Sequence, residues 1–166
     1  LGAGCPPIGC AESDTVLAGG GLRFGDYKAG EKIDHLAGIT VEDAEHMMAT
    51  RLYQNTARIH FDHFTGSKGR FGRRLIYGGH AISLARALSF NGLANAFHVA
   101  AINGGRHVAP LFAGLTVFAW SEILATAELP GRNDVGALRL RTVATKDRSC
   151  ANFPYKTGDD YDPAVI

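Results

Sequence analysis

Hydrophobic periodicity along the chain predicts a strand and a helix early in the sequence. Residues 32–36 alternate between apolar and polar side chains, as a half-buried strand does. Thr40 precedes acidic side chains and is expected to cap a helix that ends near Tyr53. The apolar face of this helix is expected to consist of Ala44, Met47, Met48 and Leu52.

A second helical pattern covers residues 79–90, and its composition differs from that of the first. Small and apolar side chains, including Ile82 and Leu88, occupy most sides of the predicted helix. A helix that is apolar nearly all round is buried, so a sheet is expected to wrap it. Asn91 and Gly92 are expected to stop it.

The chain after this helix is dominated by β-prone runs with turn signals between them. The runs are residues 97–102, 106–111, 116–124 and 137–144. Glycine pairs or a Pro-Gly turn separate them, as in an antiparallel meander. The pattern therefore predicts an α+β domain in which a curved antiparallel sheet surrounds one long central helix.

Size and composition indicate one domain preceded by an arm. The 166 residues suffice for one core, and residues 1–22 are rich in Gly, Pro and Ala without periodicity. We expect a flexible arm or linker over 1–22 and a single domain over 23–166. The domain is expected to lack its last strand, because the sequence ends at residues 160–166 as an apolar strand pattern begins.

Charge and cysteine content limit the kinds of partner that the chain is expected to bind. The 17 basic and 16 acidic side chains leave a net charge of +1, which predicts neither a nucleic-acid nor a membrane partner. With neither a spanning segment nor a secretory signal, a cytoplasmic protein is expected. Cys5, Cys10 and Cys150 form an odd set without the spacing of a zinc site, so we expect thiols and no metal.

Three stretches carry a family resemblance. The texts RLYQNTARIHF, GRFGRRLIYGGH and ALSFNG place His60 eighteen positions before Gly78, where the second helical pattern begins. The run from Asn55 to Gly78 resembles the active-site stretch of the MaoC-like (R)-specific enoyl-CoA hydratases, and the wider text is most similar to the branch that acts on mesaconyl-CoA. The resemblance implies the hotdog fold, an acyl-CoA thioester substrate and no separate cofactor.

That family also implies a partner. Its mesaconyl-CoA branch carries two hotdog halves in one polypeptide, and the resemblance accounts for one half. We expect a homodimer or pairing with another hotdog domain, because an open sheet edge is commonly covered in this way.

The resemblance assigns three catalytic positions. His60 is expected to be the base, since histidine titrates near neutral pH. Gly78, at a helix N-terminus, is expected to donate its N–H to the thioester oxygen, where negative charge develops. Asn55 stands where the family pattern has an aspartate, and an amide hydrogen-bonds without titrating. His60 must then carry most of the proton transfer, unless Asp62 supplies the carboxylate.

The second carboxylate of a mesaconyl group requires cations or donors. Guanidinium groups bind carboxylates bidentately, and Lys68 and Arg70 are alternatives for the CoA phosphates. Ser83 either orients His60 or bonds its own helix backbone. The expected substrate-binding residues are Arg58, Arg73, Arg74, Tyr77, Ser83 and Arg106.

Two other classes of function share these features. A non-catalytic hotdog module would bind an acyl-CoA or pair with an active half, which Asn55 allows. A thioesterase would release free CoA from a saturated acyl-CoA. Thiol release separates a thioesterase from a hydratase, and binding without turnover identifies the module.

Overall fold

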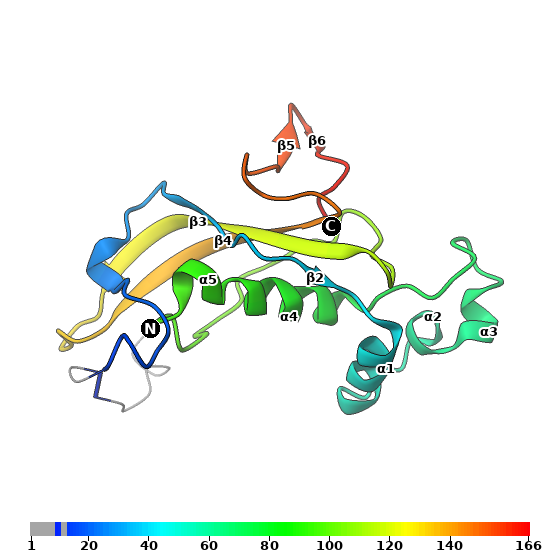
Figure 1. Ribbon diagram of the computed structural model, residues 1–166, viewed down its shortest axis with the longest axis horizontal. Helices are drawn as coiled ribbons and strands as arrows, with labels where there is room; N and C mark the ends of the chain where they lie inside the picture. Colours follow the sequence, from blue (N-terminus) through cyan, green and yellow to red (C-terminus); the bar gives the residue numbers. More distant parts are fainter. Residues whose placement is uncertain (1–8, 11–12) are drawn as a thin grey trace.

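The computed structural model describes residues 9–10 and 13–166, so part of the expected arm lies outside the described residues. A long antiparallel sheet runs through the molecule (Figure 1). Helix α4, Gly78–Leu88, lies along one face of this sheet, and the C-terminal hairpin lies on the other. The helices α1, Asp43–Leu52, α2, Arg58–Phe61, and α3, His63–Gly66, project from one end of the sheet.

The sheet is built around β3. Strands β3, Thr116–Glu128, and β4, Gly136–Lys146, pair along their lengths in antiparallel register, with an irregularity between Ile123 and Ala125. Two short strands, β1 at Lys32–Asp34 and β2 at Ile39–Thr40, pair with the other edge of β3. The strands predicted at 32–36, 116–124 and 137–144 are therefore confirmed.

Helix α4 packs its buried side against the centre of the sheet. Ala81, Leu84 and Leu88 form a core cluster with Val117 and Ala119 of β3. The helix is 11 residues long, so a helix against the sheet is observed, but it is shorter than the predicted long one. The chain bends after Leu88 at Asn91 and Gly92, within the short α5, Phe90–Leu93, and Gly92 has a φ of 99°. This positive φ favours glycine, as the Asn-Gly stop signal predicted.

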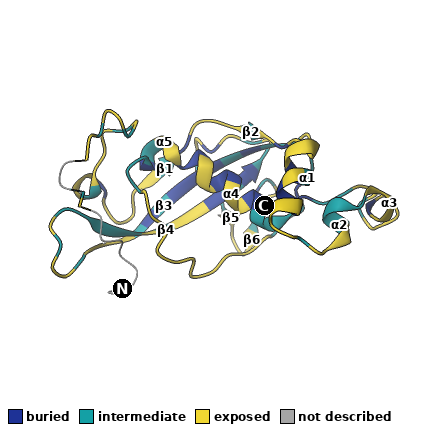
Figure 2. Cartoon of the chain, turned by 90° about the horizontal axis from the view of Figure 1, so that it is seen from below, coloured by how far each residue is buried: buried dark blue, intermediate teal, exposed yellow. Residues whose placement is uncertain are grey.

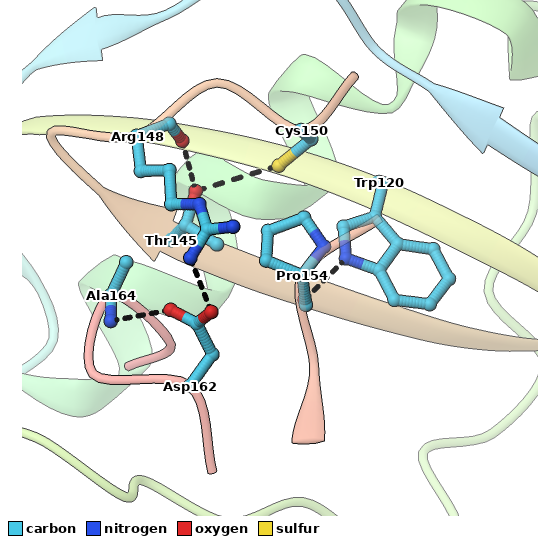
Figure 3. Close-up of polar contacts among 7 residues, drawn as sticks. All are labelled: Trp120, Thr145, Arg148, Cys150, Pro154, Asp162 and Ala164. Atoms are coloured by element: carbon cyan, nitrogen blue, oxygen red, sulfur yellow. Dashed lines mark hydrogen bonds and ion pairs between the residues drawn. The ribbon is translucent and has the colours of Figure 1, made fainter. Parts of the chain in front are cut away.

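The C-terminal segment covers the opposite face. It contains the short strands β5, Lys156–Thr157, and β6, Asp160–Tyr161, which pair with each other. The Trp120 indole donates to Pro154 O at 2.9 Å, and Thr145 Oγ1 donates to Arg148 O at 2.6 Å (Figure 3). Arg148 also pairs with Asp162. Both faces of β3 are thus covered over residues 116–124, which are all buried or half-buried, whereas residues 125–128 at its far end are exposed (Figure 2).

Helix α1, Asp43–Leu52, differs from its prediction in two respects. Thr40 belongs to β2, and Glu42 occupies the N-cap position without a side-chain cap. The predicted apolar face is wrong, since Met48 and Leu52 are 64% and 71% exposed. The buried face carries His46, Ala49 and Thr50 instead. A hydrogen-bonded histidine can be buried, and apolarity alone does not identify it.

The predicted strands at 97–102 and 106–111 are also wrong. The described chain has no strand there, and residues 97–107 are all exposed. β-Prone side chains form a strand only where another strand supplies hydrogen-bond partners. Among the described residues, the second edge of β4 is paired only near its C-terminal end, where Thr145 forms an isolated bridge with Val165 and the Ile166 N–H donates to Ala144 O. The rest of that edge has no partner strand in the described part of the chain.

Three short helices complete the described structure. A 3-10 helix, η1, spans Phe24–Asp26 near the first strand. Two helices of one turn, α2 at Arg58–Phe61 and α3 at His63–Gly66, lie between α1 and the segment that leads into α4.

Candidate functional site

Three histidines from three helices meet where α1, α2 and α4 converge. The ring centroid of His46, on α1, is 6.4 Å from that of His60 on α2 and 5.7 Å from that of His80 on α4. Glu45 Oε1 lies 3.6 Å from His80 Nε2. We call His46, His60 and His80 the histidine cluster. It gathers three groups capable of proton transfer at the start of the central helix.

His60 is held in one tautomer. Its Nδ1 lies 2.9 Å from the carbonyl oxygen of Leu75. A carbonyl only accepts, so Nδ1 carries the proton and the lone pair of the neutral ring is on Nε2. The Leu75 N–H donates to Ile59 O at 3.1 Å, which fixes α2 to the same segment. The Tyr77 ring meets His60 edge-on at 5.8 Å. His60 is thus oriented as a base through Nε2.

His46 is fully buried and accepts a backbone hydrogen bond. The N–H of Tyr77 donates to His46 Nε2 at 2.9 Å, so the proton of the neutral ring is on Nδ1. Burial, followed by the charges of His80 and His60, lowers the pKa of His46 to about 4. His46 is therefore neutral near pH 7.

This low pKa predicts a pH-dependent stability. An unfolded histidine titrates near 6.5, so between about pH 6.5 and 4 the unfolded chain binds more protons than the folded one. The contribution of His46 to the free energy of unfolding is full above about pH 6.5 and falls as the pH decreases. We expect a loss of roughly 3 kcal/mol by pH 4. Chemical denaturation at pH 7, 5.5 and 4 tests this, and His46→Gln should show a shallower pH dependence.

Gly78 begins α4, where the first N–H groups have no partner within the helix. A Cβ added at Gly78 would lie 2.4 Å from His107 Nε2. A side chain at position 78 would therefore displace the His107 ring. His107 lies in the exposed 97–107 segment, which brings a fourth imidazole to the N-terminus of α4.

Asn55 shapes the chain before α2. Its side-chain oxygen accepts the N–H of Ala57 at 2.9 Å, and its own N–H donates to Thr50 O at 2.8 Å. The Asn55 side-chain oxygen is thus engaged in a local turn of the Asx type.

Asp62, the alternative carboxylate, caps α3. It accepts the Thr65 N–H at 3.1 Å and the Thr65 hydroxyl at 2.6 Å. These bonds lower the pKa of Asp62 below its usual value, so it remains a carboxylate rather than a proton donor.

We expect Asp62→Ala to loosen α3 while leaving turnover nearly unchanged, because the carboxylate acts on Thr65. Amide hydrogen exchange of residues 63–66 would report the loss of the cap, and a steady-state assay would report activity. Asp62→Asn, which keeps an accepting oxygen, is the matched control. A drop in kcat of more than about tenfold in Asp62→Ala would restore Asp62 to the catalytic set.

The expected substrate-binding arginines divide into two groups. Arg74 pairs with Asp43 at 2.8 Å, and Arg73 donates to Ala113 O at 2.9 Å while stacking on Phe112. Both arginines line a cavity of about 130 Å³ with Asp43, His63 and Ala113. Arg58 and Arg106 are exposed and lie outside this cavity.

The remaining expected contacts have local partners. Ser83 Oγ donates to Gly79 O at 2.9 Å, which is the helix-backbone bond anticipated as the alternative to a contact with His60. Lys68 lies 3.4 Å from the centre of the Phe64 ring, and Arg70 lies 5.3 Å from that of Phe71. Tyr77 is the N-cap of α4 and adjoins His60.

A larger cavity, of about 720 Å³, lies elsewhere. Its lining combines Gly19–Leu22 of the arm with Leu36, Phe90 and Asn91 and is mostly apolar. Asp34 is its single charged group among the described residues. The histidine cluster contributes nothing to it, so volume and chemistry point to different places. We place the candidate site at the histidine cluster, because a reaction requires groups that move protons.

The sequence identified some of these residues and missed others. His60 and Gly78 were found by motif, whereas His46, Glu45 and His107 were given no role. The spacing of His46 and Ala49 on one helical face was the available signal for His46. His107 lies 29 residues from Gly78 in sequence, and no local pattern predicts their contact.

The described residues contain neither a cluster of metal ligands nor a helix that could span a membrane. Among residues 9–10 and 13–166, no group of three or more His, Cys, Asp or Glu side chains is arranged to hold a metal ion. In the same part of the chain, every helix is too short or too polar to cross a bilayer.

Comparison with known proteins gives two close relatives by sequence. The β-methylmalyl-CoA dehydratase of Chloroflexus aurantiacus is 61% identical over 160 residues, which are 96% of this chain and 46% of that protein. The mesaconyl-CoA hydratase of Cereibacter sphaeroides is 62% identical over 135 residues, which are 80% of this chain and 38% of that protein. No family model matches the chain. The chain spans about half the length of the curated relatives it matches.

Solved structures agree with the sequence relatives. A Chloroflexus aurantiacus protein described as a MaoC domain dehydratase superposes with a TM-score of 0.92 at 60% identity, over 98% of this chain and 47% of that one. A Mycobacterium tuberculosis protein described as having a double hotdog fold superposes with a TM-score of 0.62 at 27% identity, over 85% of this chain and 40% of that one.

The antiparallel sheet with a helix on one face is that of a hotdog-type domain, with imidazoles gathered at the helix N-terminus. The chain belongs to the MaoC-like hydratase family.

Proposed function

We propose that the chain takes part in the reversible addition of water to a 2-enoyl-CoA thioester, with mesaconyl-CoA as the substrate and β-methylmalyl-CoA as the product. The observation that carries the proposal is the tautomer of His60, whose Nε2 is left as a proton acceptor near the start of α4. The names of the two curated relatives support the substrate. No separate cofactor is required, because the thioester itself supplies the electron sink.

In the proposed reaction, His60 Nε2 takes a proton from water as the water oxygen adds to the β carbon. The carbon–carbon double bond then becomes an enolate, with negative charge on the thioester oxygen. The Gly78 N–H and the N-terminus of α4 stabilise that charge. His60 returns the proton to the α carbon, so that one molecule of water is added overall. Asn55 contributes by shaping the α1–α2 turn and does not transfer a proton.

The second carboxylate of the substrate is assigned to Arg73 and Arg74. Both line the 130 Å³ cavity. The positive charge of Arg74 also helps to lower the pKa of His46, so Arg74 interacts electrostatically with the histidine cluster. A guanidinium binds a carboxylate with two hydrogen bonds, whereas a crotonyl group has no carboxylate for it to bind. Competition between mesaconyl-CoA and crotonyl-CoA measures this preference. Equal kcat/KM values would contradict a dicarboxylate site.

We also propose that a second hotdog domain completes the structure. The exposed 97–107 segment has β-prone residues, and most of the second edge of β4 has no partner strand among the described residues. The relatives are also about twice as long as this chain. The occupant is either the remaining half of such a polypeptide or a second copy of this chain. Light scattering of the purified chain distinguishes a dimer from a monomer, and a monomer would leave the other half as the partner.

The test of function follows absorbance of the enoyl thioester when mesaconyl-CoA is mixed with the purified chain, with free thiol measured in parallel. Loss of enoyl absorbance without thiol supports a hydratase, whereas thiol release from a saturated acyl-CoA supports a thioesterase. Binding without either signal supports a non-catalytic module. Light scattering of the same sample measures the oligomeric state in which the chain was assayed.

A further inference from the structure

We propose that His46 is a positioning residue that holds the first turn of α4, and thereby the Gly78 N–H, in the orientation needed for the thioester oxygen. The inference rests on the proposed hydratase function, and it adds a residue from a different helix to that site. His46 touches no reacting atom in this proposal. It acts through the backbone of Tyr77.

Hydrogen bonds hold the peptide groups on both sides of Tyr77. Its N–H donates to His46 Nε2 at 2.9 Å, and its carbonyl accepts the N–H groups of His80 and Ala81 at 2.9 and 3.3 Å. Both sides of Tyr77 are therefore fixed by hydrogen bonds, one from α1 and one from α4 itself. Tyr77 consequently keeps an extended backbone, with φ −64° and ψ 132°, immediately before the helix.

The direction of the Gly78 N–H follows from this arrangement. The Tyr77 carbonyl and the Gly78 N–H belong to one planar trans peptide, so they point in opposite directions. Since the carbonyl points into the first turn of α4, the N–H points away from the helix. If the bond to His46 is lost, Tyr77 is held on its carbonyl side alone, and the first turn of α4 is no longer tied to α1. The Gly78 N–H then moves with that turn relative to the substrate.

An imidazole is suited to this role because its acceptor is rigid and buried. His46 is fully buried, and the edges of its ring meet His60 from α2 and His80 from α4. The titratable groups that act on it electrostatically are His80, His60, Arg74 and Asp43, which come from all three helices and from the segment before α4. A neutral ring accepts from the Tyr77 N–H, and a protonated ring cannot.

The experiment compares His46→Leu with His46→Gln, whose side-chain oxygen can accept the Tyr77 N–H. We expect His46→Leu to lower kcat for mesaconyl-CoA hydration by roughly ten- to hundredfold, with KM changed less than about threefold, because misorientation affects the transition state more than binding. His46→Gln is expected to restore most of kcat. The fraction of folded protein is measured for each variant.

The matched controls are His35→Leu and His35→Gln. His35 is also fully buried and hydrogen-bonded, to Asn91 O at 2.6 Å and Ser121 Oγ at 2.9 Å, but it lies at the other end of α4. Both controls are expected to lower stability while keeping kcat per folded molecule. An equal loss of kcat in His35→Leu and His46→Leu would reduce His46 to a structural role and overturn the proposal.

Amide hydrogen exchange separates this proposal from the proposed function. The Tyr77 amide is expected to exchange at least roughly tenfold faster in His46→Leu than in the wild type, and near the wild-type rate in His46→Gln. Unchanged exchange at Tyr77 in His46→Leu overturns the positioning role whether or not the protein is active. A wild type without hydration activity, but with the expected exchange pattern, refutes the proposed function and keeps the hydrogen-bond assignment.

Discussion

Replacing His60 by alanine is expected to lower kcat for mesaconyl-CoA hydration by roughly 10²- to 10⁴-fold, the usual contribution of a positioned base. The loss follows from removal of the Nε2 acceptor, which the bond from Nδ1 to Leu75 O keeps in place. Steady-state rates at saturating substrate measure it. Near wild-type turnover would contradict the assignment of His60.

His60→Gln distinguishes proton transfer from structural support. The glutamine amide can still donate to Leu75 O, but it does not titrate near neutral pH. We expect this variant to unfold at nearly the wild-type temperature and to be as inactive as His60→Ala. Activity retained in His60→Gln would show that His60 supports the loop and that another group moves the proton.

Replacing Gly78 by alanine is expected to have the second largest effect. The added Cβ would lie 2.4 Å from His107 Nε2, so the His107 ring must move. His107 is exposed and can give way at small cost to stability, but the methyl group then stands at the start of α4 where the thioester oxygen is proposed to bind. We expect a fall in kcat/KM of roughly ten- to hundredfold with little change in unfolding temperature.

Two further variants identify the cause of the loss of activity in Gly78→Ala. Gly25→Ala is the matched control, because a Cβ at Gly25 meets nothing within 4 Å, and full activity is expected. The double variant Gly78→Ala, His107→Ala removes the ring that the methyl group displaces. If the double variant recovers full activity, displacement of His107 caused the loss; if it remains impaired, the methyl group itself blocks the thioester.

The structure confirms the elements that have the longest and most regular local patterns. The helix at Gly78–Leu88 and the strands β3 and β4 have long, regular patterns, and each packs in the way its pattern implies. In contrast, the buried face of α1 is set by the bond between His46 and the Tyr77 N–H, which joins residues 31 positions apart. Residues 97–111 have the side chains of strands without a partner strand among the described residues.

The residues of the candidate site also differ in whether a local sequence pattern identifies them. His60 and Gly78 lie in one continuous motif, so the family resemblance identified both. His46 and His107 reach the start of α4 through the tertiary fold, one from α1 and one from the exposed segment. The sequence suggested Asp62 as a replacement for the missing aspartate of the family pattern. In the structure the Asp62 carboxylate caps α3 instead.

The covering of the sheet by the C-terminal segment has a practical consequence. Trp120 is the single tryptophan of the chain, and it is 1% exposed beneath that segment, with Phe153 and Tyr155 packed edge-on against it. Its intrinsic fluorescence is therefore a built-in optical reporter of whether the C-terminal segment is docked. Because the histidine cluster is formed by α1, α2 and the first turn of α4, and Trp120 lies on β3, the emission of Trp120 and the rate of the proposed hydration can be followed as two separate signals in one sample.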